Sequence, residues 1–489
     1  MSPTFTSLRN PDYRLWATGA LVSNTGTWMQ RVAQDWLVLT VLTSDSGVAV
    51  GVTTGLQFAP VLLLAPIAGA VADRADRRRL LMLTQAASAV LALVLGLLVV
   101  GGVVRLWEVL VLATLLGTVS AFDAPARQSF VSELVPPEDL PNAVGLNSAS
   151  FHGGRLIGPG VAGLLIGWIG TGPVFLINAA SFGAVLLSLA RMRPERLRPA
   201  TRAPRHGGVR DGVRYVRGRP DILLILVIVG VVGAFGLNFQ LTTALMARTV
   251  FHRGSGEYGL LGSSMAIGSL AGALLAARRE HPGIRLVVGA TAAFGVLATV
   301  AAVMPVYLLF AVALIPVGVA TQTLMTAANS SVQLSTAPEL RGRVMALYLA
   351  VFMGGTPLGA PLVGWIGQTF GARWTIVVGG VSALLVAAGA WAWLLRQRDR
   401  QPDQSVQPDQ SVQPGDVADQ LVADEGDHVQ HGVRDHQRQH AAPAPEPLAE
   451  HQAHHGVAEE RSEPLVQVVA APQDGADPED QPGGQPQLA

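Results

Sequence analysis

The stretch VAVGVTTGLQFAPVLLLAPIAGAVADRADRRR at residues 48–79 contains an apolar run that ends in a dense cluster of charges. Residues 48–71 carry no charged side chain, whereas charges are frequent from Asp73 to Arg79. An α-helix of about 20 apolar residues spans the hydrocarbon core of a bilayer, which is about 30 Å thick. The stretch therefore predicts a membrane-spanning helix that emerges into water close to Asp73.

Runs of this kind recur along most of the 489 residues, and only 14% of the residues are charged. Soluble proteins carry about 25% charged residues. A single apolar run can be the core helix of a soluble protein, but a dozen within 400 residues cannot. The sequence predicts an all-α polytopic membrane protein with twelve transmembrane helices, at about residues 15–42, 48–71, 80–101, 106–124, 143–167, 173–190, 221–245, 258–277, 286–304, 306–328, 344–366 and 374–395. Because twelve is even, both termini are expected on one side.

Arginine residues are distributed unevenly over this predicted topology. Residues 1–400 contain 31 Arg and 17 acidic residues, a balance of +14. With a cytoplasmic N-terminus, 25 of these Arg lie in cytoplasmic segments, two lie in spans and four lie in external loops, namely Arg105, Arg248, Arg253 and Arg373. Positive charge concentrates in the cytoplasmic loops of membrane proteins. We therefore expect a bacterial cytoplasmic (inner) membrane protein with both termini in the cytoplasm.

The longest break between spans divides them into two sets of six. Residues 191–220 contain ten Arg and form a predicted cytoplasmic linker between residues 1–190 and residues 221–395. Within this linker, Val209–Arg219 is either a basic helix on anionic lipid headgroups or a solvated tether. The tetrapeptide Gly-Trp-Ile-Gly ends both the fifth and the eleventh span. This echo favours two pseudo-symmetric six-helix bundles that rock about a central cavity.

Residues 396–489 differ from the rest of the chain. From residue 401 onward, the sequence holds 17 acidic residues and 3 Arg, repeats QPDQSV and has few large apolar side chains. Such a segment buries too little surface to offset the entropy lost on ordering. We expect a disordered cytoplasmic tail without a metal site, and its seven His leave metal binding as an alternative.

The charged segment after the second span has a spacing that suits a conformational latch. A Gly at position 69 lets a neighbouring helix approach closely, and an Asp near a helix N-terminus is stabilised by the helix dipole. The Arg cluster can pair with acids on neighbouring helix ends, which would hold the two halves together in one conformation and release them in the other. The latch candidates are Gly69, Asp73, Arg74, Asp76, Arg77 and Arg78. The alternative is a positively charged turn that only fixes topology.

This segment resembles the signature loop GxxxDRxGRRxx of the major facilitator superfamily, with Asp76 in place of the usual Gly. Asp76 with flanking Arg is similar to the subgroup of drug and siderophore exporters that contains macrolide efflux proteins and the enterobactin exporter. The resemblance also includes residues 8–16, 122–128 and 211–217, and it covers about residues 8–395. It implies the major facilitator fold and a transport function.

The fifth predicted span contains small residues at helical spacing, in the pattern Gly154-x-x-x-Gly158-Pro159-x-x-Ala162-Gly163. Small residues four apart let helices approach closely, and a Pro inside a helix removes a backbone hydrogen bond and bends the helix. The pattern resembles the antiporter signature of facilitator-superfamily exporters, which favours export over uptake. The hinge candidates are Gly154, Gly158, Pro159 and Gly163, and the alternative is ordinary small-residue packing.

Several polar side chains lie inside the predicted spans. Asn24, Arg31 and Asp35 lie within about 20° of one line on the first span, at about 100° per residue. Arg155 in the fifth span fits the pattern of the exporter subgroup and is a second possible partner for Asp35. Together with Asp123, which lies in the 122–128 motif, these residues are our candidates for proton coupling or substrate contact.

Asp35 is the carboxylate that lies deepest within a predicted span. Burial favours its neutral form, whereas a nearby Arg31 or Arg155 favours its charged form. A carboxyl balanced between these effects can load and release protons. The alternative is a structural ion pair in which Asp35 only neutralises Arg31 at helical spacing.

The sequence therefore predicts a secondary active transporter that exports small amphipathic molecules of the drug or siderophore class, by proton-coupled antiport and alternating access. Uptake or lipid transport on the same fold, and a non-transporting receptor or scaffold, are the alternatives. An enzyme is not expected, because the sequence lacks HExxH and GxSxG motifs and a Lys for a P-loop. The expected partners are a small-molecule substrate, protons and the lipid bilayer, without a cofactor, nucleotide or nucleic acid.

Overall fold

The computed structural model describes residues 3–198, 209–277, 283–338 and 340–399. In these residues, twelve helical segments cross the bundle and no strand occurs. The first six are α1 (Pro11–Leu37) with its continuation η2 (Val38–Leu42), α2 (Gly47–Arg74), α3 (Arg77–Val100), α4 (Leu106–Leu134), α5 (Leu140–Ile169) and α6 (Thr171–Arg191). The second six are the composite α8 (Pro220–Val231), η5 (Val232–Gly236), α9 (Phe239–Leu245) and η6 (Met246–Val250), followed by α10 (Ser255–Ala277), α11 (Ile284–Ala302), α12 (Tyr307–Ser335), α13 (Arg341–Phe370) and α14 (Ala372–Asp399).

Shorter elements lie before and between these segments. They are η1 (Pro3–Arg9), η3 (Pro137–Asp139), η4 (Pro194–Arg196) and the helix α7 (Val209–Arg217). The structure contains a helix over most of the range Val209–Arg219, and this helix packs against α13, whereas a contact with lipid headgroups stays a prediction. The π-helical elements η2, η5 and η6 all lie in the first crossing segment of a half. Such π turns are frequent at functional sites.

Ten of the twelve segments qualify as membrane spans by length and composition, among the residues that the structure describes. The two that do not qualify are α1 and α5. These helices carry Arg31, Asp35 and Arg155. The charges that are most expensive to place in a membrane are therefore concentrated on two helices of the first half.

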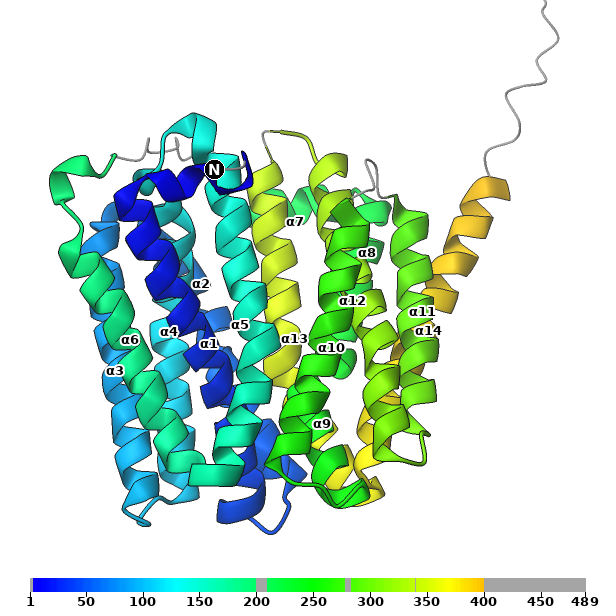
Figure 1. Ribbon diagram of the computed structural model, residues 1–489. Coiled ribbons are helices and arrows are strands. Elements are labelled where there is room, and N and C mark those ends of the chain that lie inside the picture. Colours follow the sequence, from blue (N-terminus) through cyan, green and yellow to red (C-terminus); the bar gives the residue numbers. More distant parts are fainter. Residues whose placement is uncertain (1–2, 199–208, 278–282, 339, 400–489) are drawn as a thin grey trace, which may run out of the picture. The chain divides into compact units, whose positions relative to one another are not determined.

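Successive segments run in opposite directions, so the bundle has two ends. We call the end with Asn10 and Asp76 the terminus side, because α1 begins there and α14 ends there (Figure 1). We call the opposite end, with residues 43–46, the Asp45 side. Side chains cap helices at both ends: Asn10 accepts from the Asp12 amide at 2.9 Å, and Ser46 Oγ accepts from the Ala49 amide at 3.3 Å. These caps satisfy amides that have no partner within the helix.

The twelve segments form two six-helix halves. In the first half, α1 packs against α5 and α6, α2 against α4, and α3 against α4 and α6. In the second half, α10 packs against α12, and α11 packs against α12 and α14. The halves meet where α2 lies along α13 and where α5 lies along α10 (Figure 1). The predicted all-α fold with twelve crossing helices is therefore confirmed.

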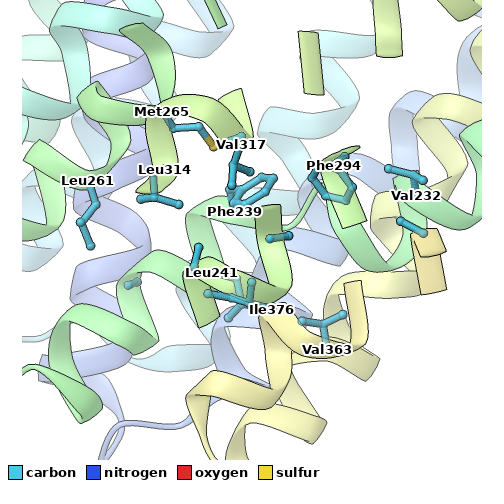
Figure 2. Packing of buried hydrophobic residues seen from close by; sticks show 14 of the residues in the cluster. Val232, Phe239, Leu241, Leu261, Met265, Phe294, Leu314, Val317, Val363 and Ile376 are labelled. Carbon is cyan, nitrogen blue, oxygen red and sulfur yellow. The ribbon is translucent and has the colours of Figure 1, made fainter. Parts of the chain in front are cut away.

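Buried apolar side chains form two separate clusters. One cluster joins the Asp45-side part of the first half, which includes Trp36, to the second half, which includes Phe239 and Phe294. Figure 2 shows the packing of this cluster around Phe239 and Phe294. The other cluster contains Trp16 and Phe130 and lies at the terminus side of the first half. The apolar core is therefore shared by the two halves toward the Asp45 side.

The observed helices follow the predicted spans in number and order, and all except α11 are longer. For example, α4 continues to Leu134, ten residues beyond the predicted end at residue 124, and α14 continues to Asp399. The extra turns carry Arg127 and Arg396, which an apolar pattern alone does not include. Residues 400–489, which hold most of the predicted tail, lie outside the described residues.

Candidate functional site

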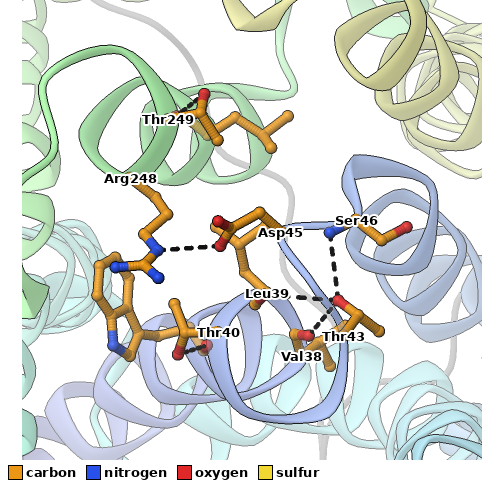
Figure 3. Close-up of polar contacts among 10 residues, drawn as sticks. Val38, Leu39, Thr40, Thr43, Asp45, Ser46, Arg248 and Thr249 are labelled. Carbon is orange, nitrogen blue, oxygen red and sulfur yellow. Dashed lines mark hydrogen bonds and ion pairs between the residues drawn. The ribbon is translucent and has the colours of Figure 1, made fainter.

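Polar contacts join the two halves on the Asp45 side. Arg248 Nε in η6 donates to Asp45 Oδ1 at 2.9 Å (Figure 3). Gln368 Oε1 on α13 accepts from Ser46 Oγ at 2.8 Å and from the Val48 amide at 3.3 Å. We call these contacts the Asp45-side clamp. It fastens the turn between α1 and α2 to two elements of the other half.

The Asp45 turn has an unusual backbone. Asp45 has a φ of 58° in the left-handed region, where Asp is tolerated better than most residues because its short side chain can hydrogen-bond locally. His252 has a φ of 52° and follows the first crossing segment of the other half. The two halves therefore end their first crossing segments with similar tight turns, and only the Asp45 turn supplies an acid to the clamp.

The predicted latch residues on the terminus side contact their own half. Arg77 forms an ion pair with Glu133 of α4 at 2.5 Å, and Arg78 Nε donates to the Leu189 carbonyl of α6 at 2.8 Å. Asp76 caps α3, since it accepts from the Arg79 amide at 3.0 Å. Asp73 and Arg74 are exposed. In this conformation the segment ties α3 to α4 and α6.

Gly69 does not show the close helix approach expected from the sequence. A Cβ at this position would meet no heavy atom of the described residues within 4 Å. The reason is that α2 contacts α13 closer to its other end, where Gly47 and Gly51 lie against the α13 backbone. A latch between the halves on the terminus side therefore remains a prediction for a different conformation.

The small residues of α5 face two different neighbours. A Cβ on Gly154 would lie 3.0 Å from the backbone of Asn24 and Thr25, and one on Gly158 would lie 2.7 Å from Trp28 Cβ. These two glycines therefore let α5 approach α1 of its own half closely. Substitution by a larger residue would force these helices apart.

The other face of α5 packs against α10 of the second half. A Cβ on Gly163 would lie 3.1 Å from the Gly259 Cα, and a Cβ on Gly259 would collide with the Pro159 carbonyl oxygen. Ser255 Oγ donates to the Gly163 carbonyl at 3.1 Å, and Ser263 Oγ donates to the Leu156 carbonyl at 3.0 Å. The four hinge candidates thus lie between α1 and α10, where a movement of one half relative to the other would change the helix contacts.

Asp35 is buried, and its partner comes from the opposite half. The hydroxyl of Tyr258 on α10 lies 3.4 Å from Asp35 Oδ2 and 3.3 Å from the Gln240 carbonyl on α9. The Tyr258 ring stacks on Trp36, with ring centroids 5.7 Å apart and an interplanar angle of 19°. Among the described residues, Asp35 forms no ion pair within 4.0 Å, so the structural Arg31–Asp35 pair considered above is absent.

Arg31 and Arg155 lie on the aromatic ring of Trp28. Their guanidinium carbons are 4.8 Å and 5.5 Å from its centroid, and Arg31 also lies 5.2 Å from the centroid of Phe58 on α2. Arg31 Nε is buried without a hydrogen-bond partner among the described residues. Arg155 therefore contacts the same aromatic ring as Arg31 and does not pair with Asp35.

The remaining two candidates lie apart from Asp35. Asn24 Nδ2 donates to Ser150 Oγ at 3.1 Å, which links α1 to α5. Asp123 accepts from Thr84 and Gln85 of α3 at 2.7 Å each, and from Arg127 Nε at 3.1 Å. The structure therefore brings Arg31 and Arg155 together but places Asp123 in a separate network.

Sequence reasoning did not identify Tyr258, Trp28 or the Asp45–Arg248 pair. Tyr258 lies 223 residues from Asp35 and Arg248 lies 203 residues from Asp45. No periodicity within one helix reports a contact at such separation. The only available signal was the Asp at the tight turn after the first span, which suits a left-handed backbone.

The comparison with protein families gives one match, to the transmembrane secretion effectors, over residues 2–442. The staphyloferrin A transporter of Staphylococcus aureus is 23% identical over 364 residues, which are 74% of this chain and 91% of that protein. The multidrug efflux pump Tap of Mycolicibacterium fortuitum is 29% identical over 391 residues, which are 76% of this chain and 93% of that protein.

Two solved structures are similar in fold. A bacterial homologue of the human lysosomal transporter Spinster, in an inward-facing and unoccupied conformation, has a TM-score of 0.66 at 17% identity and covers 80% of this chain and 99% of that chain. The nucleoside transporter NupG has a TM-score of 0.61 at 12% identity, with coverage of 78% and 99%. At these identities the likeness concerns the fold alone.

Proposed function

Since the chain belongs to the transmembrane secretion effectors of the major facilitator superfamily, we propose that it is a secondary exporter of small amphipathic molecules that works by proton antiport and alternating access. The observation that carries the proposal is the seam between the halves. It is fastened on the Asp45 side by the clamp and by a shared apolar core, whereas the charged segment on the terminus side contacts its own half. This asymmetry is what alternating access requires of one of its two end states.

The direction of transport rests on two features. The small-residue seam of α5 contacts both α1 and α10, so a bend at Pro159 would change how the halves meet. Two relatives of comparable length are a multidrug efflux pump and a siderophore transporter. We therefore propose export, and the substrate would be an amphipathic molecule of the drug or siderophore class.

Three interior residues are proposed to serve transport directly. Asp35 would carry the proton, because it is the buried acid at the contact between the halves. Arg31 and Arg155 would contact a hydrogen-bond acceptor of the substrate, because Arg31 Nε is buried without a partner and both guanidinium groups lie on Trp28. A charge deep in a membrane protein usually faces a pathway.

The export proposal is tested by measuring a panel of fluorescent amphipathic compounds in cells with and without the gene. Lower accumulation in cells with the gene, which disappears when a protonophore collapses the proton gradient, is the expected result. Higher accumulation would indicate uptake on the same fold. An unchanged accumulation of every compound would favour a receptor or scaffold.

The orientation is proposed to place both termini in the cytoplasm, because the Arg residues concentrate on the terminus side. The chain has no Cys, so single Cys substitutions can be labelled without background. A Cys in place of Arg253, on the Asp45 side, should react with an impermeant reagent added outside intact cells. A Cys in place of His206, which lies outside the described residues, should be protected. The opposite labelling pattern would reverse the orientation.

A further inference from the structure

The hydroxyl of Tyr258 has one hydrogen and two acceptors within reach. One acceptor is Asp35 Oδ2 on α1 of the first half, at 3.4 Å, and the other is the Gln240 carbonyl on α9 of its own half, at 3.3 Å. A phenol donates one hydrogen bond at a time at full strength. The acceptor that carries more negative charge therefore receives it.

The surroundings of Tyr258 hold its ring in a position from which the hydroxyl can donate to either acceptor. Tyr258 is 2% exposed, and its ring stacks on Trp36, the residue that follows Asp35 on α1. The stacking fixes the ring, so the hydroxyl hydrogen is the part that is free to turn. Asp35 is 5% exposed, so water does not readily replace this donor in the present conformation.

We propose that Tyr258 is a positioning residue for proton release: its hydrogen turns from the Gln240 carbonyl to the Asp35 carboxylate when Asp35 loses its proton. The proton passes from the carboxyl to solvent, and no other bond forms or breaks. A hydrogen bond from a phenol to a carboxylate is stronger than one to a neutral carbonyl. The turn therefore stabilises the ionised carboxylate in a place where burial disfavours it.

This inference rests on the proposed role of Asp35 as the proton carrier. The charged and titratable groups that act on Asp35 are Arg31 on its own helix and Tyr258 on α10. Arg155 on α5 acts on Arg31, and Gln240 on α9 is uncharged. The two Arg keep their charge throughout the relevant pH range. Tyr258 is the group whose hydrogen bond changes with the state of Asp35, and it belongs to the opposite half. Proton release would therefore strengthen the contact between the halves.

The test is an infrared titration of the carboxyl group in the full-length protein in lipid, without any substrate. The carboxyl band that disappears in Asp35→Asn reports protonated Asp35. In Tyr258→Phe the titration midpoint should move to higher pH by about one unit, a tenfold change in proton affinity, because the carboxylate loses its donor. Tyr348→Phe is the matched control: this buried Tyr lies 3.5 Å from the Met325 carbonyl within its own half and should leave the midpoint unchanged.

A second variant keeps the shape of the site. Incorporation of 3-fluorotyrosine at position 258 makes the phenol a stronger donor and should move the midpoint to lower pH. A midpoint that stays the same in both variants, or that moves down in Tyr258→Phe, would overturn the proposal. Because this titration needs neither substrate nor gradient, its outcome is independent of the export measurement, so failure of the Tyr258 role is distinguishable from failure of the transport proposal.

Discussion

The two ends of the seam between the halves are built differently. On the Asp45 side, Arg248 and Gln368 of the second half bind the turn at residues 45–48, and the apolar core is shared by both halves. On the terminus side, Arg77 and Arg78 bind α4 and α6 of their own half, and a separate apolar cluster lies beneath them. One end thus holds the halves together, and the other holds a single half in shape.

This difference indicates which interactions close each end of the seam. The Asp45–Arg248 pair is exposed, with 38% of the Asp45 side chain and 45% of the Arg248 side chain accessible, so it contributes only about 0.2–1 kcal/mol. Closure on that side must therefore come mainly from apolar packing, with the clamp as a small bias. The terminus side has exposed charges at Asp73 and Arg74, which are available for contacts in the opposite conformation.

The largest effect is expected from Asp35→Asn, which removes the acid that Tyr258 contacts across the seam. The amide keeps the shape but cannot carry a proton at physiological pH. Net export driven by a proton gradient should be lost in proteoliposomes, whereas the protein should still fold and bind substrate. Gradient-driven export at the wild-type rate by well-folded Asp35→Asn would exclude the coupling role, and a fall in yield or thermal stability would instead indicate a structural role.

The next effect concerns the charged segment on the terminus side. Asp73→Asn keeps the shape and removes the charge, and it should reduce export by at least about tenfold while the protein still reaches the membrane. The latch hypothesis gives Asp73 a charge-assisted hydrogen bond in the opposite conformation, and loss of such a bond, at about 1.5–3 kcal/mol, shifts a two-state equilibrium by that factor or more. Asp76→Asn provides a comparison, because Asp76 serves as a helix cap in this structure. Wild-type turnover in Asp73→Asn would reduce the segment to a topology signal.

Features that depend on one helix could be predicted from the sequence, whereas contacts between distant helices could not. Ten of the crossing helices follow from their apolar lengths, and α1 and α5 were predicted from apolar runs that also hold charges. The small-residue face of α5 follows from the spacing of Gly154, Gly158 and Gly163, because such features depend on neighbours along one helix. The partners of Asp35 and Asp45 depend on where distant helices meet. Helical spacing suggested Arg31 as the partner of Asp35. In the structure the partner is Tyr258, because Arg31 lies on the rings of Trp28 and Phe58 instead.

A third effect should distinguish the seam from the rest of the membrane interior. In Gly163→Ala the added Cβ would meet the Ser255 carbonyl at 2.5 Å and the Gly259 Cα at 3.1 Å, so α5 and α10 must separate. Overpacking of this kind costs about 1–3 kcal/mol, and thermal unfolding should occur at a lower temperature than in wild type. Gly183→Ala is the control on α6, since its Cβ would meet nothing within 4 Å among the described residues. Equal stability of the two variants would show that the close approach at Gly163 is not needed.

The smallest effect is expected at the Asp45-side clamp, and a double-mutant cycle isolates it. Asp45→Asn and Arg248→Gln should each raise the population that is open on the Asp45 side by up to about fivefold, since an exposed pair contributes at most about 1 kcal/mol. Spin labels at Val103 and Val306, exposed residues on that side of the first and second half, would report the opening as a longer distance. The absence of native Cys lets both labels be attached without other changes.

The combined variant decides whether Asp45 and Arg248 act as a pair. If the effect arises from their contact, the double variant should open the Asp45 side no further than either single variant, because the second substitution has nothing left to remove. Arg253→Gln is the matched control, since Arg253 lies on the same side but stacks on Tyr307 of its own half, at 5.8 Å. Additive effects of the two substitutions would show that the two residues act independently of each other, and an equal opening in Arg253→Gln would assign the change to the loss of a positive charge from this surface. In that case the apolar core alone would close the Asp45 side, and the contrast between the two ends would lie in packing rather than in polar contacts.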